Sequence, residues 1–131
     1  MIIADSDVWI GLLRSPDTPV AIELTSLLRA NKIAVVGVVL AEVLQGSRGE
    51  QEYGQLLNRL EALRYLEMDR ETWTKTGEIA MQLRNKGLVT PLTDIAIAAV
   101  ALEGNHEVFT NDKRHFARIP GLRLYEAEGA A

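Results

Sequence analysis

The sequence contains no cysteine and only two histidines among its 131 residues. Without cysteine the chain forms no disulfide bond and no thiolate zinc site, and two histidines are too few for a metal site built from histidine alone. The longest apolar run, Ile33 to Ala41, is far too short to span a bilayer. The first residues carry two acids, Asp5 and Asp7, and no basic cluster, so we expect no secretory signal, no membrane partner and a cytoplasmic location.

The composition is that of a soluble globular protein, with 47% hydrophobic and 24% charged residues. The sequence shows no linker, no internal repeat and no low-complexity stretch. Its length is typical of one domain with a real core. We therefore predict a single domain over residues 1–131, with a frayed tail at residues 127–131.

Short apolar runs alternate with segments of helical periodicity. Thr18 and Pro19 form the start signal of one helix, and Gly87 is a stop signal for another. Strands that alternate with helices predict an α/β fold, a three-layer sandwich with a central, mostly parallel β-sheet flanked by helices. The expected strands are residues 1–4, 33–38, 65–68, 108–109 and 122–124, and the expected helices are residues 8–13, 20–28, 39–45, 53–63, 70–86, 94–103 and 113–118.

Four carboxylates occur in separate apolar settings, each near an expected end of a strand or helix. Asp5 follows the first strand, and Glu42 comes soon after the second. Asp94 opens the helix that leads into the strand at residues 108–109, and Asp112 follows that strand. In open parallel sheets, sites lie outside the carboxyl ends of the strands, near the point where the strand order reverses. We therefore expect the four acids to meet there, and a divalent metal ion is the simplest partner for such a cluster.

Each acid also has a structural interpretation. Asp5 or Asp7 can cap the helix that follows the first strand, and Asp112 can stabilise a turn. Glu42 can lie on the solvated face of an apolar helix. Asp94 can be a helix cap, but the helix dipole also favours a metal-binding carboxylate at that position, so its two roles are compatible.

The net charge of −4 is at odds with the basic surface typical of nucleic-acid-binding proteins. With Asp7 included, five acids are candidates for the site and need not contribute to the charge of the remaining surface. Removing them from the 18 acidic residues leaves 13, one fewer than the 14 basic residues. Charge therefore neither supports nor excludes a nucleic-acid substrate. Lys113 and Arg114 are candidate contacts to substrate phosphates, and a solvated helix face explains them as well.

The histidines and tryptophans carry no pattern that points to chemistry. We interpret His106 and His115 as structural or surface residues. Trp9 and Trp73 are interpreted as core residues, in preference to platforms on which bases stack.

Five short motifs occur in order along nearly the whole chain. They are IADSDVWI at residues 3–10, VLAEVLQG at 39–46, LRNKG at 83–87, DIAIAA at 94–99 and TNDKRHF at 110–116. Each motif is weak, but their order and spacing together are specific. The chain resembles the PIN-domain family, and within it the VapC-like toxins of bacterial and archaeal toxin–antitoxin pairs.

The resemblance implies a PIN-like sandwich that cleaves RNA as a Mg²⁺- or Mn²⁺-dependent endoribonuclease. It also implies a homodimer and a cognate antitoxin that covers the active site. Family members often have Ser, Thr or Asn where this chain has Asp7, so the role of Asp7 stays open. The family's acidic residues correspond to Asp5, Glu42, Asp94 and Asp112, with Asp5, Asp94 and Asp112 as metal ligands and Thr110 as an accessory residue.

Two other functions remain open. Residues 5–8 also fit the start of haloacid-dehalogenase-type phosphatases, in which the first aspartate, here Asp5, becomes phosphorylated. Lys113 can be offered as the lysine of that family, but no Gly-Asp motif occurs near the C-terminus and the chain is short for that fold. The other alternative is a non-catalytic PIN-like interaction module. The intact set of acids argues against it.

Overall fold

The computed structural model describes residues 1–127, and residues 128–131 of the predicted frayed tail lie outside this range. Five strands form one sheet in the order β3-β2-β1-β4-β5, and every neighbouring pair is parallel. The predicted parallel sheet is confirmed, and all five carboxyl ends lie at the same edge. The strands are β1 (Ile2–Ala4), β2 (Ile33–Val36), β3 (Arg64–Leu66), β4 (Glu107–Phe109) and β5 (Arg123–Leu124).

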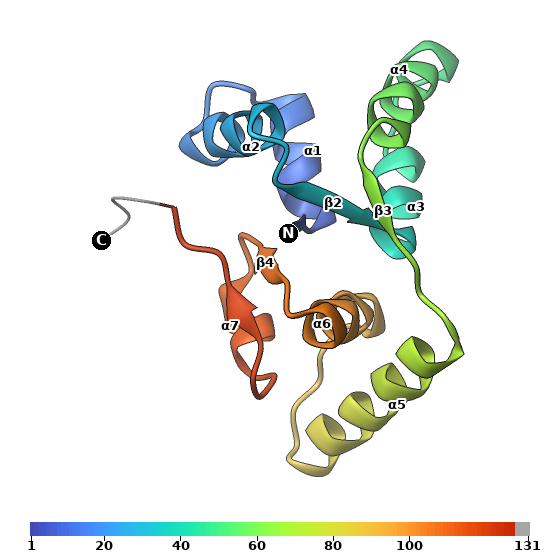
Figure 1. Cartoon of the computed structure of the whole chain (residues 1–131), viewed down its shortest axis with the longest axis vertical. Coiled ribbons are helices and arrows are strands. Elements are labelled where there is room, and N and C mark those ends of the chain that lie inside the picture. Colours follow the sequence, from blue (N-terminus) through green and yellow to red (C-terminus); the bar gives the residue numbers. More distant parts are fainter. Residues whose placement is uncertain (128–131) are drawn as a thin grey trace.

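The helices cover both faces of the sheet, as Figure 1 shows. The chain moves outward from β1 to β3, with α1 to α4 on one face, and then crosses back to β4 and β5, with α5 to α7 on the other. Right-handed crossovers require this change of face when the direction reverses. The predicted three-layer sandwich is confirmed. The helices are α1 (Ser6–Arg14), α2 (Pro19–Arg29), α3 (Gly37–Gln45), α4 (Glu50–Glu61), α5 (Arg70–Asn85), α6 (Leu92–Gly104) and α7 (Lys113–Ala117).

The strand order reverses between β1 and β4. Ala4 pairs with Phe109 at the carboxyl ends of these two strands, and the Asp5 N–H donates to the Phe109 carbonyl at 3.0 Å. Asp5 and Thr110 are thus the first residues beyond the two central strands. This is the position at which open α/β sheets bind their ligands.

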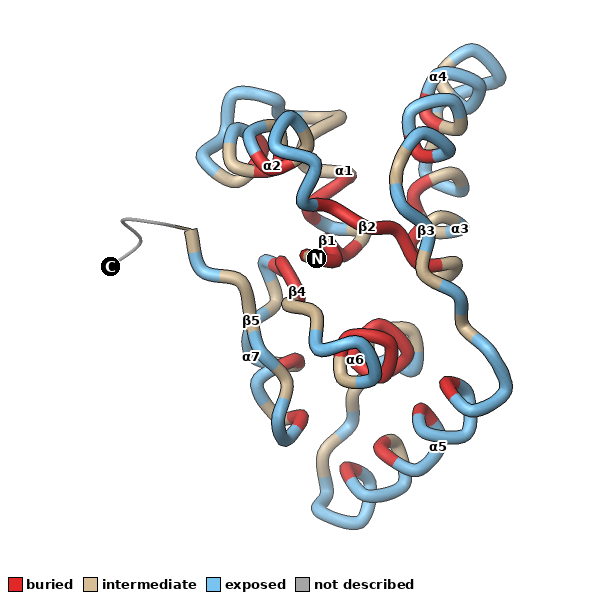
Figure 2. The backbone as a smooth tube through the Cα atoms, viewed as in Figure 1, coloured by how far each residue is buried: buried red, intermediate tan, exposed pale blue. Residues whose placement is uncertain are grey.

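Helix α6 is buried on every side, as its uniformly apolar sequence predicts. Seven consecutive residues, 95–101, are buried, and Figure 2 shows this helix as the most buried one. It packs against α5 on one side and contacts α3 and β4 on others. Even so, no helix within residues 1–127 is long and apolar enough to cross a membrane.

Two predicted helix signals are confirmed. The Thr18 hydroxyl accepts a hydrogen bond of 3.2 Å from the Ala21 N–H in the first turn of α2, and Pro19 is the first residue of that helix. At the end of α5, Gly87 adopts a positive φ of 76°, and the Leu88 N–H donates to the Leu83 carbonyl at 2.9 Å. Glycine adopts this backbone conformation without the steric cost that a Cβ imposes.

The boundary between β2 and α3 differs from the prediction. The strand ends at Val36 and the helix begins at Gly37, two residues earlier than expected. The run from Ile33 to Ala41 is apolar throughout, so it satisfies a buried strand and a buried helix equally well.

One of the two tryptophans does not lie in the core. Trp9 is buried, with 4% of its surface exposed, but Trp73 on α5 is 46% exposed, so its assignment to the core was wrong. The buried side of α5 begins with the threonines Thr72 and Thr76, and Trp73 lies off that side. The position of a residue around the helix decides whether it faces the core, so an aromatic side chain at the position of Trp73 is exposed.

We predict that Ile97→Ala in α6 lowers the free energy of unfolding by about 2–5 kcal/mol, because Ile97 is 1% exposed and its removal leaves a cavity. The matched control is Ile22→Ala in α2, where the side chain is 59% exposed and the expected change is within about 0.5 kcal/mol. Urea unfolding of both variants measures the difference. Equal losses in the two variants would contradict the burial of α6.

Candidate metal centre

Asp5 is a buried carboxylate at the end of β1, with only 4% of its surface exposed. It caps α1, because its Oδ1 accepts the Val8 N–H at 3.2 Å, and its Oδ2 accepts the hydroxyl of Thr110. Burial, together with the negative charges of Asp7 and Asp94, raises the pKa of Asp5 to about 6 in spite of these hydrogen bonds. The capping role and the clustering with other acids, both considered from the sequence, occur together.

Asp94 lies half-buried in the first turn of α6. Pro91 is the cap residue of this helix, and the cap position makes no side-chain hydrogen bond, so Asp94 is not the cap. Burial raises the pKa of Asp94 to about 6. The charges of Asp112, Glu42 and Asp7 raise this pKa as well.

Glu42 and Asp7 reach the same edge of the sheet from α3 and α1. Burial raises the pKa of Glu42, a hydrogen bond with Ser6 opposes this, and the charge of Asp7 adds to it. Asp7 is exposed, yet its charge also raises the pKa values of Asp5 and Asp94. Asp7 therefore lies close to three of the four predicted acids.

Asp112 caps the short helix α7. Its Oδ1 accepts the His115 N–H at 3.4 Å, and its Oδ2 contacts the His115 Nδ1. Its own N–H donates to Thr110 Oγ1 at 2.9 Å, so Thr110 joins Asp112 to Asp5. One ligand atom each from Asp94, Asp112 and His115 lie within 4.8 Å of one another.

Within residues 1–127, His115 beside Asp112 is the basic side chain in contact with the carboxylate cluster (Asp5, Asp7, Glu42, Asp94 and Asp112). In the described part of the chain, no lysine or arginine forms an ion pair with any of the five. Gathering like charges without a counter-charge is costly, and a divalent cation relieves that cost through the oxygen ligands it prefers. The donor atoms of Asp94, Asp112 and His115 therefore fit a divalent metal ion, whereas Asp5, Asp7 and Glu42 do not belong to that close group.

The two predicted phosphate contacts lie on α7, next to Asp112. Lys113 and Arg114 are both exposed, and the Lys113 Nζ forms an ion pair of 2.7 Å with Glu126. An exposed pair of this kind is weak and is easily exchanged for another anion. Both side chains are therefore accessible to a ligand in solvent.

Two residues of the site were not identified from the sequence. His115 was interpreted as structural or surface, and Ser6 was not considered. One sequence signal could have revealed the contact between Asp112 and His115. The two residues are three positions apart, which is the spacing of a cap residue and the first turn of its helix. Ser6 has no comparable signal, because its contact with Glu42 depends on the packing of α1 against α3.

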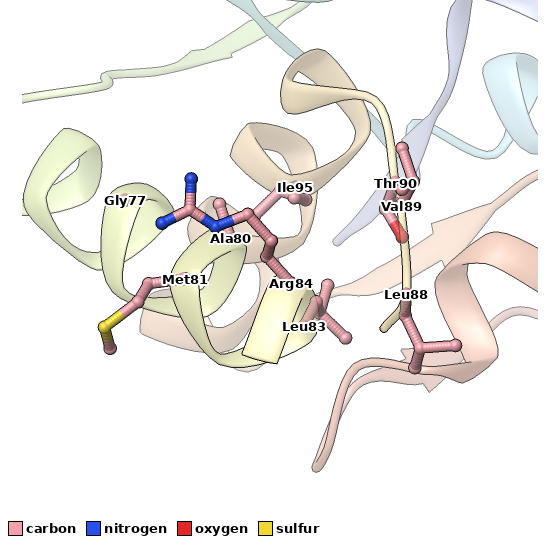
Figure 3. A pocket seen from close by; sticks show the side chains of 9 residues that line it. All are labelled: Gly77, Ala80, Met81, Leu83, Arg84, Leu88, Val89, Thr90 and Ile95. Atoms are coloured by element: carbon pink, nitrogen blue, oxygen red, sulfur yellow. The ribbon is translucent and has the colours of Figure 1, made fainter. Parts of the chain in front are cut away.

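A cavity of about 320 Å³ lies elsewhere, between α5 and the start of α6 (Figure 3). Its walls are mostly apolar, with Leu83, Leu88 and Ile95 among them, and Arg84 is the charged residue that lines it. None of the carboxylate cluster lines this cavity. Its walls offer no carboxylate to a cation, so the candidate centre is the open edge of the sheet.

Comparison with known proteins identifies the family of the chain. A family model of the PIN domain matches residues 2–122. The chain belongs to the PIN-domain family. The Rickettsia felis protein Ribonuclease VapC2 is 32% identical to this PIN domain over 105 residues, which are 77% of this chain and 78% of the relative.

Two further comparisons extend the likeness over more of the chain. Ribonuclease VapC1 of Methanocaldococcus jannaschii is 27% identical over 115 residues, with 84% and 85% of the two chains covered. The crystal structure of VapBC2 from Rickettsia felis, bound to a DNA fragment from their promoter, contains a chain that superposes with a TM-score of 0.80 at 26% identity. That superposition covers 98% of this chain and 100% of the other. The family resemblance seen in the motifs is confirmed, and the phosphatase alternative is not favoured.

We predict that Asp94→Asn stabilises the metal-free protein at neutral pH. A carboxyl group with a pKa of about 6 in the folded protein, above its ordinary 3.8, binds its proton more tightly when folded, so stability falls as the pH rises through that window. Asparagine does not ionise, so it removes the loss of stability that ionisation of Asp94 causes. Discounted for the partial exposure of Asp94, the expected gain is about 1 kcal/mol above pH 6, vanishing near pH 4.

Urea unfolding in EDTA between about pH 4 and pH 8 measures this gain. Asp17→Asn, which neutralises an exposed acid outside the cluster, is the control and should follow the wild-type profile. Excess Mg²⁺ should raise the stability of wild type more than that of Asp94→Asn. A variant that is less stable than wild type in EDTA would show that the helix dipole, not repulsion, dominates at Asp94.

Proposed function

We propose that this chain is a metal-dependent endoribonuclease, the toxin of a toxin–antitoxin pair, with Asp5, Glu42, Asp94 and Asp112 as its active site. One observation supports this above the others. Acids from four separate elements of a PIN domain gather at the strand-order reversal, and none of them has a lysine or arginine partner among residues 1–127. A structural role explains each acid alone, but not their convergence.

In this proposal Asp5, Asp94 and Asp112 hold Mg²⁺ or Mn²⁺. Such an ion would supply the positive charge that offsets the charge of the scissile phosphate and lowers the pKa of a water molecule. Thr110 orients Asp5 by donating to its Oδ2, and the Val8 N–H fixes the other oxygen. These two hydrogen bonds fix the orientation of the buried carboxylate at the end of β1.

Glu42 is the carboxylate we assign to the proton of the attacking water. Its pKa is raised by burial and by the charge of Asp7, which suits a group that must take up a proton. Ser6 keeps it in place through their hydrogen bond. Asp7 is an accessory residue that strengthens the field at the cluster, and Lys113 and Arg114 contact the RNA phosphates.

The partners follow from the relatives and remain proposals for this chain. The relatives from Rickettsia felis and Methanocaldococcus jannaschii are named ribonucleases, which supports RNA as the substrate. The Rickettsia felis structure is a VapBC2 complex, which supports a cognate antitoxin. We further propose a homodimer, a cytoplasmic location, and a single PIN domain over residues 1–131.

Asp5→Asn and Asp94→Asn should each lower RNA cleavage by more than about 100-fold while the fold survives, because each replacement keeps the shape and removes a ligand charge. Asp17→Asn is the matched control and should retain wild-type activity. The assay is cleavage of RNA in Mg²⁺, with circular dichroism and urea unfolding as checks of the fold. Full activity in either variant would contradict the site, whereas activity in Asp7→Asn would mark Asp7 as accessory.

RNA cleavage should require added Mg²⁺ or Mn²⁺ and should disappear in EDTA, since the acids alone supply no positive charge to the phosphate. The phosphatase alternative predicts the opposite substrate preference and a phosphorylated Asp5. We expect no phosphorylation of Asp5 by small phosphoesters, as measured by mass spectrometry. Turnover of phosphomonoesters without RNA cleavage would overturn the nuclease, and metal binding without either activity would favour an interaction module.

A further inference from the structure

His115 lies within the motif at residues 110–116, but the proposed mechanism gives it no role. It lies on α7, three residues after the cap residue Asp112, and its side chain is 32% exposed. Its Nδ1 contacts Asp112 Oδ2, while Asp112 Oδ1 is occupied by the backbone N–H of the same histidine. The short helix thus holds the imidazole beside one particular carboxylate oxygen.

The imidazole also faces Asp94 across the site. One ligand atom each from His115, Asp94 and Asp112 lie within 4.8 Å of one another, which is close enough for all three to contact one ion. The acids that face His115 are Asp112, the cap residue of its own helix, and Asp94 on α6, whose pKa is raised by burial and also by the charges of Glu42 and Asp7. His115 is therefore a nitrogen donor surrounded by oxygen donors.

We propose that His115 is a ligand of the divalent ion held by Asp94 and Asp112, through Nδ1, and that it makes this site prefer Mn²⁺ to Mg²⁺. The inference rests on the proposed function, because it assumes that the carboxylate cluster binds a cation. Mg²⁺ prefers an all-oxygen shell and gives up its waters reluctantly, whereas first-row transition metals accept imidazole nitrogen readily. A nitrogen donor in this position therefore discriminates between the two ions.

A purely structural role for His115 makes a different prediction. If the Nδ1–H only donates to Asp112 Oδ2, the histidine orients that carboxylate and acts on every cation equally. If Nδ1 is a ligand, the neutral ring carries its proton on Nε2, and only the transition metal gains from it. The ratio of the two affinities separates these roles, and it requires no RNA and no catalytic turnover.

The experiment compares wild type, His115→Gln and His106→Gln as full-length, EDTA-treated protein. Glutamine keeps a hydrogen-bond donor but removes the imidazole, and His106 is a matched control because it precedes β4, at the opposite end of the sheet. Titration calorimetry gives the Mn²⁺ and Mg²⁺ affinities. We expect wild type to prefer Mn²⁺ by about 10-fold or more, His115→Gln to lose most of that preference, and His106→Gln to keep it.

A spectroscopic measurement on wild type keeps the test decisive even if His115→Gln does not fold. Pulsed electron paramagnetic resonance of bound Mn²⁺ should show coupling to an imidazole ¹⁴N nucleus, which persists in His106→Gln. Absence of that coupling, or an equal loss of both affinities in His115→Gln, overturns the proposal and leaves the carboxylate site intact. If neither ion binds wild type, the proposed metal-dependent function fails as well, so the two failures are distinguishable.

Discussion

The hydroxyl of Thr110 joins the ends of two strands that lie 105 residues apart in the sequence. It donates to the buried Asp5 after β1 and accepts the N–H of Asp112 after β4. Two acids from distant parts of the chain are thereby fixed to one atom at the point where the strand order reverses. The remaining acids reach this point from helices that begin at the same edge, so the whole centre depends on how closely β1 and β4 are paired.

The rest of the fold carries the cost of holding these acids together. Burial raises the pKa values of Asp5 and Asp94 to about 6, and each lies within the field of other carboxylates. The compensating stability comes from apolar burial, above all from α6, whose seven consecutive buried residues follow Asp94 directly. Along α6, the residue that experiences charge repulsion, Asp94, is followed directly by the residues whose burial stabilises the fold.

Much of this arrangement could be predicted from the sequence, because periodicity reports burial and strand ends mark the sheet edge. The all-round burial of α6, the parallel sheet and the placement of acids after strands followed from such patterns. Other features depend on tertiary contacts that no local pattern encodes. The run after Ile33 is apolar throughout, so its pattern does not show where α3 begins. Trp73 is exposed because it lies off the side of α5 that faces the core. The contacts of Ser6 and His115 form only when the helices pack together.

The pairing of the first strand with the fourth has a consequence for biosynthesis. The ribosome adds β4, the strand that pairs with β1 at the site, only about 105 residues after β1, which takes on the order of ten seconds at usual elongation rates. Until then the nascent chain contains Asp5 without Thr110 or Asp112. The order of synthesis therefore delays assembly of the acidic centre until the ribosome has passed Asp112, and a message broken between the codons for Asp5 and Thr110 encodes a chain that never assembles it.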